Sequence, residues 1–158
     1  MSDTDKRFMT RAIELARDGV NANRGGPFGC VIVKDGQIIG EGNNQVTSAN
    51  DPTAHAEIVA IRAACETLKA FSLEGCVLYT SCEPCPMCLG AIYWSRLSGL
   101  FATATREDAA AAGFDDEYFY DELEKPPGER NLKMAGLMRE ESLRVFELWN
   151  MKPDKTEY

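Results

Sequence analysis

The sequence has little of several features that would point to particular classes of protein. It contains one histidine, His55, in 158 residues, so any imidazole chemistry in the chain must use that side chain. No apolar run approaches the ~18 residues expected of a membrane span. Residues 1–7 are polar and lack the apolar core of a signal peptide. We therefore expect a cytoplasmic protein with no membrane partner.

Basic residues are also scarce. The chain has 17 Lys and Arg against 25 Asp and Glu, for a formal net charge of −8. Between residues 106 and 130, nine acidic residues stand against three basic ones. Nucleic-acid affinity comes largely from Lys and Arg that neutralise phosphates, and an acidic surface repels a phosphate backbone. We expect a small neutral substrate and no nucleic-acid partner.

Cysteine, by contrast, occurs six times. A chain of this length and ordinary composition can bury a substantial core without disulfides. In a cytoplasmic protein, reduced thiols and metal ligation are the expected uses of cysteine. Cys30, Cys65 and Cys76 lie in apolar patterns and are predicted to be core residues. The remaining three cysteines are candidates for chemistry.

Hydrophobic periodicity and turn signals predict strands that alternate with helices after an opening hairpin. A polar loop is expected at 43–52, and the Asp35-Gly36 pair is a hairpin-turn signal. The predicted helices are 5–20, 53–69, 84–96, 106–112, 115–124 and 140–149, and the predicted strands are 28–34, 37–42, 76–80, 99–103 and 132–138. This pattern indicates a layered α/β domain with a mixed sheet over residues 1–150, followed by a tail at 151–158.

Two short stretches, residues 53–57 and 84–88, carry the chemistry. Together they supply one imidazole (His55), two thiols (Cys85 and Cys88) and one carboxylate (Glu57). Both stretches follow helix-start signals, where the positive end of the helix dipole favours the thiolate that zinc requires. We predict that the imidazole and the two thiols bind one zinc ion with water as fourth ligand. Zinc lowers the pKa of such a water toward ~7, and Glu57 is predicted to move its protons.

Two other interpretations use the same cysteines. Cys82 lies three residues before Cys85, so a structural zinc site with four protein ligands is an alternative. It would leave Glu57 without a role. A redox Cys-x-x-Cys pair is a second alternative, and it would leave His55 unexplained.

The His-x-Glu and Pro-Cys-x-x-Cys stretches resemble the signature of zinc-dependent nucleotide-base deaminases. The stretches 25–29, 51–57, 80–92 and 113–116 look like those of bacterial guanine deaminases in the cytidine/deoxycytidylate deaminase-like superfamily. The likeness extends over nearly the whole chain and is weakest at 125–150. It implies a three-layer α/β/α sandwich with a mixed sheet of about five strands, and hydrolysis of guanine to xanthine and ammonia.

The resemblance also implies further site residues. Asp116 would be a second catalytic carboxylate at the purine ring. Asn44 would hydrogen-bond the purine edge, since an amide offers a donor and an acceptor. The other residues expected to contact substrate are Phe28, Ala56, Trp94, Phe114 and Tyr158. Without the resemblance, Phe28 and Trp94 would be taken as packing residues, Asn44 as a turn residue, and Asp115 or Asp116 as a helix N-cap.

In the family that the sequence resembles, the C-terminal tail crosses to a partner subunit. A homodimer is therefore expected, with Tyr158 closing the pocket of the neighbouring chain. Two alternatives remain open from sequence: a guanosine or other nucleobase or nucleoside deaminase, including one acting on tRNA adenosine, and a non-catalytic binding module stabilised by zinc.

Overall fold

The structure is a computed structural model that describes residues 2–114 and 116–158, with Asp116 described by its backbone alone. The chain divides into two compact units, residues up to Tyr120 and residues 121–158. The elements are α1 (Asp3–Asn21), β1 (Gly29–Lys34), β2 (Gln37–Asn43), α2 (Val46–Ala49), α3 (Ala56–Leu68), β3 (Val77–Cys82), α4 (Pro86–Trp94), β4 (Gly99–Ala104), α5 (Arg106–Ala111), α6 (Asp116–Glu124) and α7 (Arg139–Met151).

The first unit contains a mixed sheet in the order β2-β1-β3-β4. β1 runs antiparallel to both β2 and β3, whereas β3 and β4 are parallel. The β1–β2 connection is the predicted tight turn, in which Asp35 and Gly36 both have positive φ (49° and 75°). The mixed α/β sheet is confirmed.

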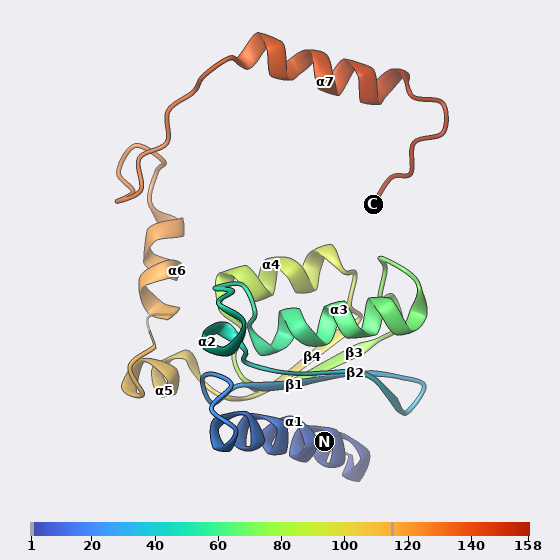
Figure 1. The fold of residues 1–158 in the computed structure, drawn as a ribbon, viewed down its shortest axis with the longest axis vertical. Coiled ribbons are helices and arrows are strands. Elements are labelled where there is room, and N and C mark those ends of the chain that lie inside the picture. The colour runs from blue at the N-terminus through green and yellow to red at the C-terminus, as the bar shows by residue number, and fades with distance from the viewer. Residues whose placement is uncertain (1, 115) are drawn as a thin grey trace. The chain divides into compact units, whose positions relative to one another are not determined.

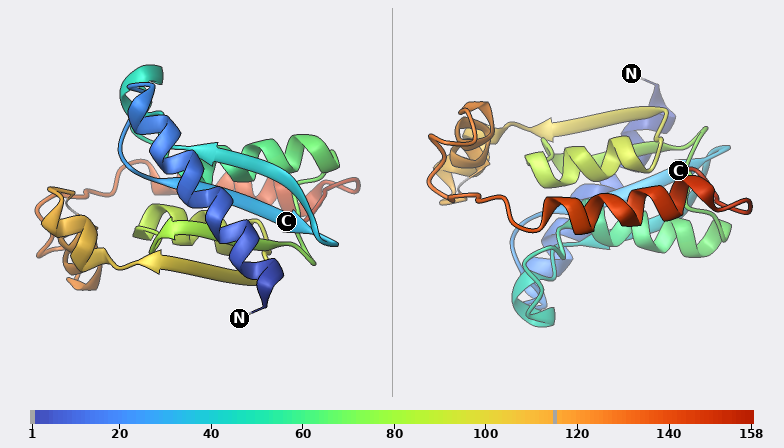
Figure 2. Two further views of the ribbon diagram at one scale, coloured as in Figure 1. Left: turned by 90° about the horizontal axis from the view of Figure 1, so that it is seen from below. Right: turned by 90° about the horizontal axis from the view of Figure 1, so that it is seen from above.

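Helices cover both faces of this sheet, as Figures 1 and 2 show. β1 is buried along most of its length, so its side chains pack alternately against one face of the sheet and the other. Val31 and Val33 pack with the α1 residues Phe8 and Ala12, whereas Ile32 packs on the opposite face among residues of α3 and β3. The three-layer α/β/α arrangement is therefore present.

α3 packs directly on the backbone of β2 because both elements have small residues where they meet. A Cβ added at Gly42 would lie 2.2 Å from the carbonyl oxygen of Ala56, and one added at Gly40 would lie 2.5 Å from that of Ala60. A side chain at either glycine would push the helix away from the sheet. This contact fixes the first turn of α3, which carries part of the site.

The sheet has four strands among the described residues, and the prediction of about five is wrong in this respect. The segment predicted as a fifth strand, 132–138, has no regular structure. A strand needs a partner for its backbone hydrogen bonds, and residues 121–158 contain no other strand. The predicted loop at 43–52 also differs, since it contains the short helix α2.

The second unit consists of the end of α6, an irregular segment and α7. Glu122 accepts a hydrogen bond from the backbone N–H of Asn131 (2.7 Å) and pairs with Lys125, while Arg130 donates to the carbonyl of Lys125 (3.1 Å). The predicted helix at 140–149 is present as α7, but most of its apolar residues, including Phe146, are exposed, and Leu143 is half-buried. A segment of this length has too few apolar side chains to bury a core of its own. None of the helices in the described parts of the chain has the length and apolar character of a membrane span.

Candidate active site

The first component of the site is the start of α3. His55 occupies the N-cap position with extended backbone angles, but its side chain makes no capping hydrogen bond. Asp51 organises the preceding turn instead, since its carboxylate accepts from the backbone N–H and the hydroxyl of Thr53 (2.8 and 2.7 Å). The imidazole of His55 therefore has no part in capping α3.

The second component is the start of α4. Cys85 is the N-cap of this helix and Pro86 its first residue, a position where the missing N–H of proline costs nothing. Cys88, in the same first turn, is fully buried. Both Cys residues therefore lie at the N-terminal end of a helix, as predicted from the prolines.

The two helix starts bring three ligand atoms together. Nδ1 of His55 lies 3.5 Å from Sγ of Cys85 and 3.5 Å from Sγ of Cys88, and all three atoms lie within 4.8 Å of one another. Tetrahedral zinc, with Zn–S of about 2.3 Å and Zn–N of about 2.0–2.1 Å, separates nitrogen and sulfur by about 3.6 Å. The residues therefore fit a zinc ion, and Nδ1 is the imidazole nitrogen that faces it.

The two thiols are electrostatically unequal. The hydrogen bond from Cys88 lowers the pKa of Cys85 to about 4, with a further contribution from His55. The same hydrogen bond, together with burial, raises the pKa of Cys88. A metal ion binds both sulfurs as thiolates, so its binding releases the proton that Cys88 otherwise keeps.

Cys82 is not part of this cluster. Its thiol donates a hydrogen bond to the carbonyl of Thr105 (3.5 Å). The metal-ligand group found among the described residues comprises His55, Cys85 and Cys88 alone. The geometry therefore favours a site with three protein ligands over the four-ligand structural alternative.

Glu57 lies beside the ligand cluster and is only 4% exposed. Its Oε1 accepts a hydrogen bond from the hydroxyl of Thr80 (3.1 Å), and its Oε2 accepts one from the thiol of Cys88 (3.3 Å). Burial raises the pKa of the carboxyl group, which is opposed by the hydrogen bonds that it accepts. A raised pKa brings a carboxyl group closer to the pH at which a catalytic group must both take up and release a proton.

A pocket of about 210 Å³ opens next to the cluster. It is lined by Gly26, Phe28, Asn44, Val46, Thr47, His55, Glu57, Glu83, Cys85 and Phe114. The rings of Phe28 and Phe114 meet edge to face, with centroids 4.8 Å apart and an interplanar angle of 78°. Pockets for drug-sized ligands span roughly 300–1,000 Å³, so this one suits a smaller planar molecule.

Asn44 contributes an amide whose orientation is fixed. Its Oδ1 accepts backbone N–H groups from Gly26 and Val46, each at 3.2 Å. These bonds occupy both lone pairs of the oxygen, which identifies the nitrogen as the group presented to a ligand. Asn44 therefore offers a hydrogen-bond donor, not the donor-and-acceptor pair expected from the sequence.

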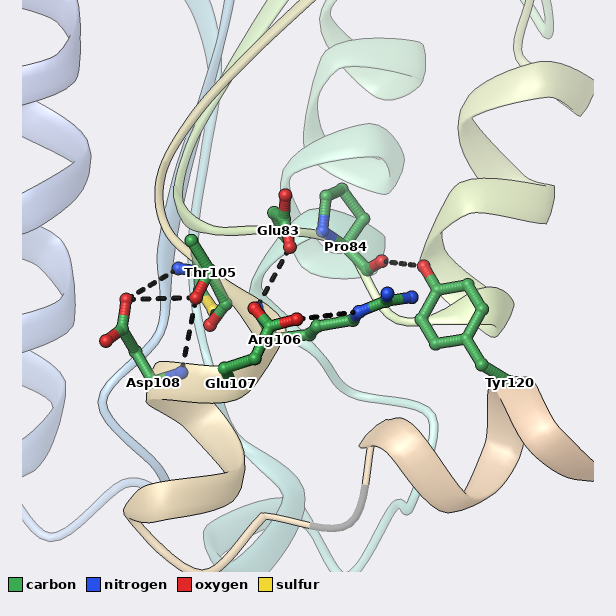
Figure 3. A network of polar contacts seen from close by, with 8 residues as sticks. Glu83, Pro84, Thr105, Arg106, Glu107, Asp108 and Tyr120 are labelled. Atoms are coloured by element: carbon green, nitrogen blue, oxygen red, sulfur yellow. Dashed lines mark hydrogen bonds and ion pairs between the residues drawn. The ribbon is translucent and has the colours of Figure 1, made fainter.

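The loop that leads to Cys85 is held by the network in Figure 3. Glu83 accepts the backbone N–H of Arg106 (2.9 Å), and the hydroxyl of Tyr120 donates to the carbonyl of Pro84 (2.9 Å). A capping box between Thr105 and Asp108 begins α5 at the same corner. The network ties the residues before the metal ligands to α5 and α6.

Three of the residues expected to contact substrate, Phe28, Asn44 and Phe114, line this pocket. Ala56, between His55 and Glu57 in the sequence, is fully buried and is not among the lining residues. Trp94 is the last residue of α4, is 65% exposed and is absent from the lining. Tyr158 belongs to the second unit and is 74% exposed there. The side chain of Asp116 lies outside the described residues. The roles of these seven residues stay predictions.

Four lining residues were not predicted: Gly26, Val46, Thr47 and Glu83. Gly26 follows another glycine and precedes a proline, a turn signal that could have suggested close approach to a ligand. A Cβ at Gly26 would lie 3.0 Å from the rings of both Phe28 and Phe114. Val46 and Thr47 belong to α2, which was expected to be loop, so the sequence offered no signal for them.

The fold and this site define a zinc-binding hydrolytic enzyme, and comparison with known proteins gives its family. Residues 2–104 match the family model of the cytidine and deoxycytidylate deaminase zinc-binding region. The chain is 56% identical to guanine deaminase of Bacillus subtilis over 151 residues, which are 96% of this chain and 97% of that protein. It belongs to the cytidine and deoxycytidylate deaminase family.

Further matches come from another curated relative and from solved structures. A tRNA-specific adenosine deaminase of Aquifex aeolicus is 47% identical over 78 residues, 49% of this chain and 52% of that protein. Among solved structures, guanine deaminase of Bacillus subtilis superimposes with a TM-score of 0.95 at 54% identity, over 100% of this chain and 99% of that one. Guanine deaminase of Nitrosomonas europaea gives a TM-score of 0.66 at 36% identity, over 69% and 63% of the two chains.

Proposed function

We propose that the protein is a zinc-dependent guanine deaminase that hydrolyses guanine to xanthine and ammonia. The observation that carries the proposal is the meeting of His55, Cys85 and Cys88 with the buried carboxylate Glu57 at one wall of a small, partly aromatic pocket. The identity of 56% to a guanine deaminase over nearly the whole chain supports the choice of substrate.

We infer that each chain holds one zinc ion through Nδ1 of His55 and the two thiolates. When bound, the ion would supply Lewis acidity, lowering the pKa of a water molecule toward ~7. Two thiolates and a neutral imidazole cancel the charge of the ion. The pocket therefore has no need of an anionic substrate, which agrees with a neutral purine base.

Glu57 is the proton carrier in this proposal. Water adds its oxygen to C2 of guanine, and the bond between C2 and the amino nitrogen breaks. One proton of the water ends on the ring nitrogen N3 and the other leaves in ammonia, so the atoms balance. Glu57 can accept each proton and release it again because burial raises its pKa.

Recognition of the base would depend on the other residues that line the pocket. Phe28 and Phe114 offer aromatic surfaces against which a purine can pack. The amide nitrogen of Asn44 is a donor, and guanine presents a carbonyl oxygen at C6 where adenine presents an amino group. A fixed donor can bond the carbonyl oxygen of guanine. Facing the amino group of adenine, it would meet another donor and stay without a partner, which disfavours adenine.

The remaining predicted residues enter the proposal through the resemblance alone. Asp116 would be a second carboxylate at the purine ring nitrogens, while Ala56 and Trp94 would contact the substrate. The tail, residues 151–158, would cross to a second copy of the chain, so that Tyr158 closes the partner's pocket in a homodimer.

The tail can be tested by complementation between two inactive variants. One lacks residues 155–158, and the other carries Glu57→Gln. In a dimer with exchanged tails, mixed dimers contain one site with an intact Glu57 and an intact tail from the other chain. We expect the mixture, after refolding together, to recover up to about a quarter of the wild-type activity per chain, since half the dimers are mixed and each has one complete site. No recovery, or an active tail-deleted variant, would contradict the exchange.

The substrate is tested by ammonia release from the zinc-loaded protein with guanine, guanosine, adenine, cytosine, cytidine and an adenosine-containing tRNA. We expect turnover of guanine far above that of the others, because the pocket has room for a base and a donor at its edge. Release only from guanosine, only from cytidine or only from the tRNA would replace the proposed substrate. No release from any of them would favour a non-catalytic zinc-stabilised module.

A further inference from the structure

A buried threonine lies behind the proton carrier. Thr80, in β3, is 0% exposed, and its hydroxyl donates a hydrogen bond to Oε1 of Glu57 at 3.1 Å. The geometry points to Thr80 as a positioning residue that fixes the Glu57 carboxylate for proton transfer. This inference rests on the proposed deaminase function and adds to it a residue that does not touch zinc or line the pocket.

The strand pairing explains how Thr80 reaches Glu57. In β3 the side chains of Tyr79 and Thr80 point to opposite faces of the sheet, and Tyr79 packs against α1. Thr80 therefore points to the face covered by α3, the helix whose first turn carries Glu57. Its register partners, Cys30 in β1 and Ala102 in β4, place it inside the sheet with a strand on either side.

The hydroxyl is not explained by packing. Valine has nearly the same shape and would fill the position without burying a polar group, which costs free energy unless it is hydrogen-bonded. The thiol of Cys30, the buried residue that pairs with Thr80 in β1, donates to the carbonyl of Val31 (3.9 Å) and not to Glu57. Thr80 thus supplies the side-chain hydrogen bond that the structure records at Oε1 of Glu57.

The consequence is that the two oxygens of Glu57 differ in function. Oε1 is anchored to Thr80, whereas Oε2 lies 3.3 Å from Sγ of Cys88. As a metal ligand, Cys88 is a thiolate and has no proton to donate. Oε2 is then the oxygen that exchanges protons with the reacting groups, while the bond to Thr80 keeps the carboxylate from rotating about its last torsion angle.

The test compares three variants of the full-length, zinc-loaded protein. Thr80→Val removes the hydroxyl and keeps the shape, whereas Thr80→Ser keeps the hydroxyl and removes a methyl group. Thr103→Val is the matched control: it also removes a hydroxyl from a strand, but that hydroxyl bonds the carbonyl of Ser81 (2.7 Å), away from Glu57. For each variant, kcat and KM for guanine, bound zinc per chain and the thermal midpoint are measured.

We expect Thr80→Val to lower kcat about ten- to a hundredfold, the effect of losing one hydrogen bond to a charged group. KM should change less than about twofold, and zinc content should not change. Thr80→Ser should recover most of kcat, and Thr103→Val should leave it within about twofold of wild type. A kcat of Thr80→Val within twofold of wild type, an equal loss in Thr80→Ser, or a loss that follows zinc content would overturn the inference.

A double-variant cycle separates positioning from a general structural effect. If Thr80 acts through the Glu57 carboxylate, Thr80→Val should have little further effect in the presence of Glu57→Gln. Equal fold-changes in both backgrounds would overturn the inference. If Thr80→Val folds poorly, Thr80→Ala, which also removes the hydroxyl, takes its place in the same cycle. A wild-type protein that releases no ammonia from guanine would instead refute the proposed function.

Discussion

Replacement of Glu57 by glutamine is the substitution that tests the chemistry most directly, because it changes the charge and proton affinity of the side chain without changing its shape. The glutamine oxygen can accept the same hydrogen bond from Thr80 that Oε1 accepts now. The glutamine nitrogen can face Cys88, which is a thiolate when it binds a metal. The three metal ligands are untouched, so fold and zinc should be retained.

The magnitude follows from the number of proton transfers that are lost. A positioned acid or base contributes about 10²- to 10⁴-fold to a proton-transfer step. The only other acidic side chain that lines the described pocket, Glu83, is bonded to the backbone of Arg106. We therefore expect no substitute carrier from the lining and a loss in kcat of about 10³- to 10⁴-fold, or about 4–5.5 kcal/mol in the barrier. KM should change less than about threefold.

The assay is ammonia release under saturating guanine, with zinc per chain and thermal unfolding measured on the same samples. Glu83→Gln is the matched control, since it removes a carboxylate from the same pocket and should lower kcat less than about tenfold. Either a tenfold or smaller loss in Glu57→Gln, or a large loss accompanied by loss of zinc, would refute the assignment of Glu57 as proton carrier.

Three further outcomes follow from other contacts. Asn44→Asp keeps the oxygen that accepts both backbone N–H groups but removes the amide donor. The KM for guanine in steady-state assays should therefore rise at least about tenfold. An unchanged KM would contradict the assignment of Asn44 as a donor to the substrate. Gly26→Ala places a methyl group 3.0 Å from the rings that wall the pocket, so KM should rise about three- to tenfold while the thermal midpoint changes little; an equal KM would show that the wall can move.

The third expected outcome concerns an ion pair away from the site and its effect on the stability of the protein. The hydrogen bonds from Arg11 (2.8 and 2.9 Å) lower the pKa of the Glu41 carboxyl group in the folded protein. The pair therefore stabilises the protein fully above the unfolded-state pKa of about 4.3. The stabilisation is lost as the pH falls through the lower, folded-state pKa. Both side chains are more than a third exposed, and Glu41→Gln should lower the free energy of unfolding by no more than about 1 kcal/mol at pH 7. Urea unfolding should show a smaller deficit at pH 3, and an equal deficit at both pH values would exclude the ion pair as its source.

Sequence reasoning works best for this protein where the decisive signals are local. The start of α4 could be placed because prolines flank Cys85, and the hairpin between β1 and β2 because Asp35 and Gly36 tolerate positive φ. Both depend on the backbone preferences of a few adjacent residues. Neither depends on what the rest of the chain does.

Sequence reasoning fails where a structure depends on residues that are far away in the sequence. Residues 132–138 alternate apolar and polar side chains in part, but alternation cannot provide the neighbouring strand that pairing requires. Thr80 shows the same limit within the site. A threonine in a strand agrees with ordinary β-propensity, so nothing in the local sequence distinguishes a packing residue from one bonded to Glu57, 23 residues earlier.

The meeting of the ligands is itself a property of strand direction. β2 and β3 both run antiparallel to β1, so they run in the same direction and end at the same edge of the sheet. The chain goes from the end of β2 through the short helix α2 to the start of α3, and from the end of β3 to the start of α4. His55 and Cys85 cap these two helices and must therefore lie near one edge. Each helix start can be predicted from a few residues, but their meeting requires the direction of all three strands.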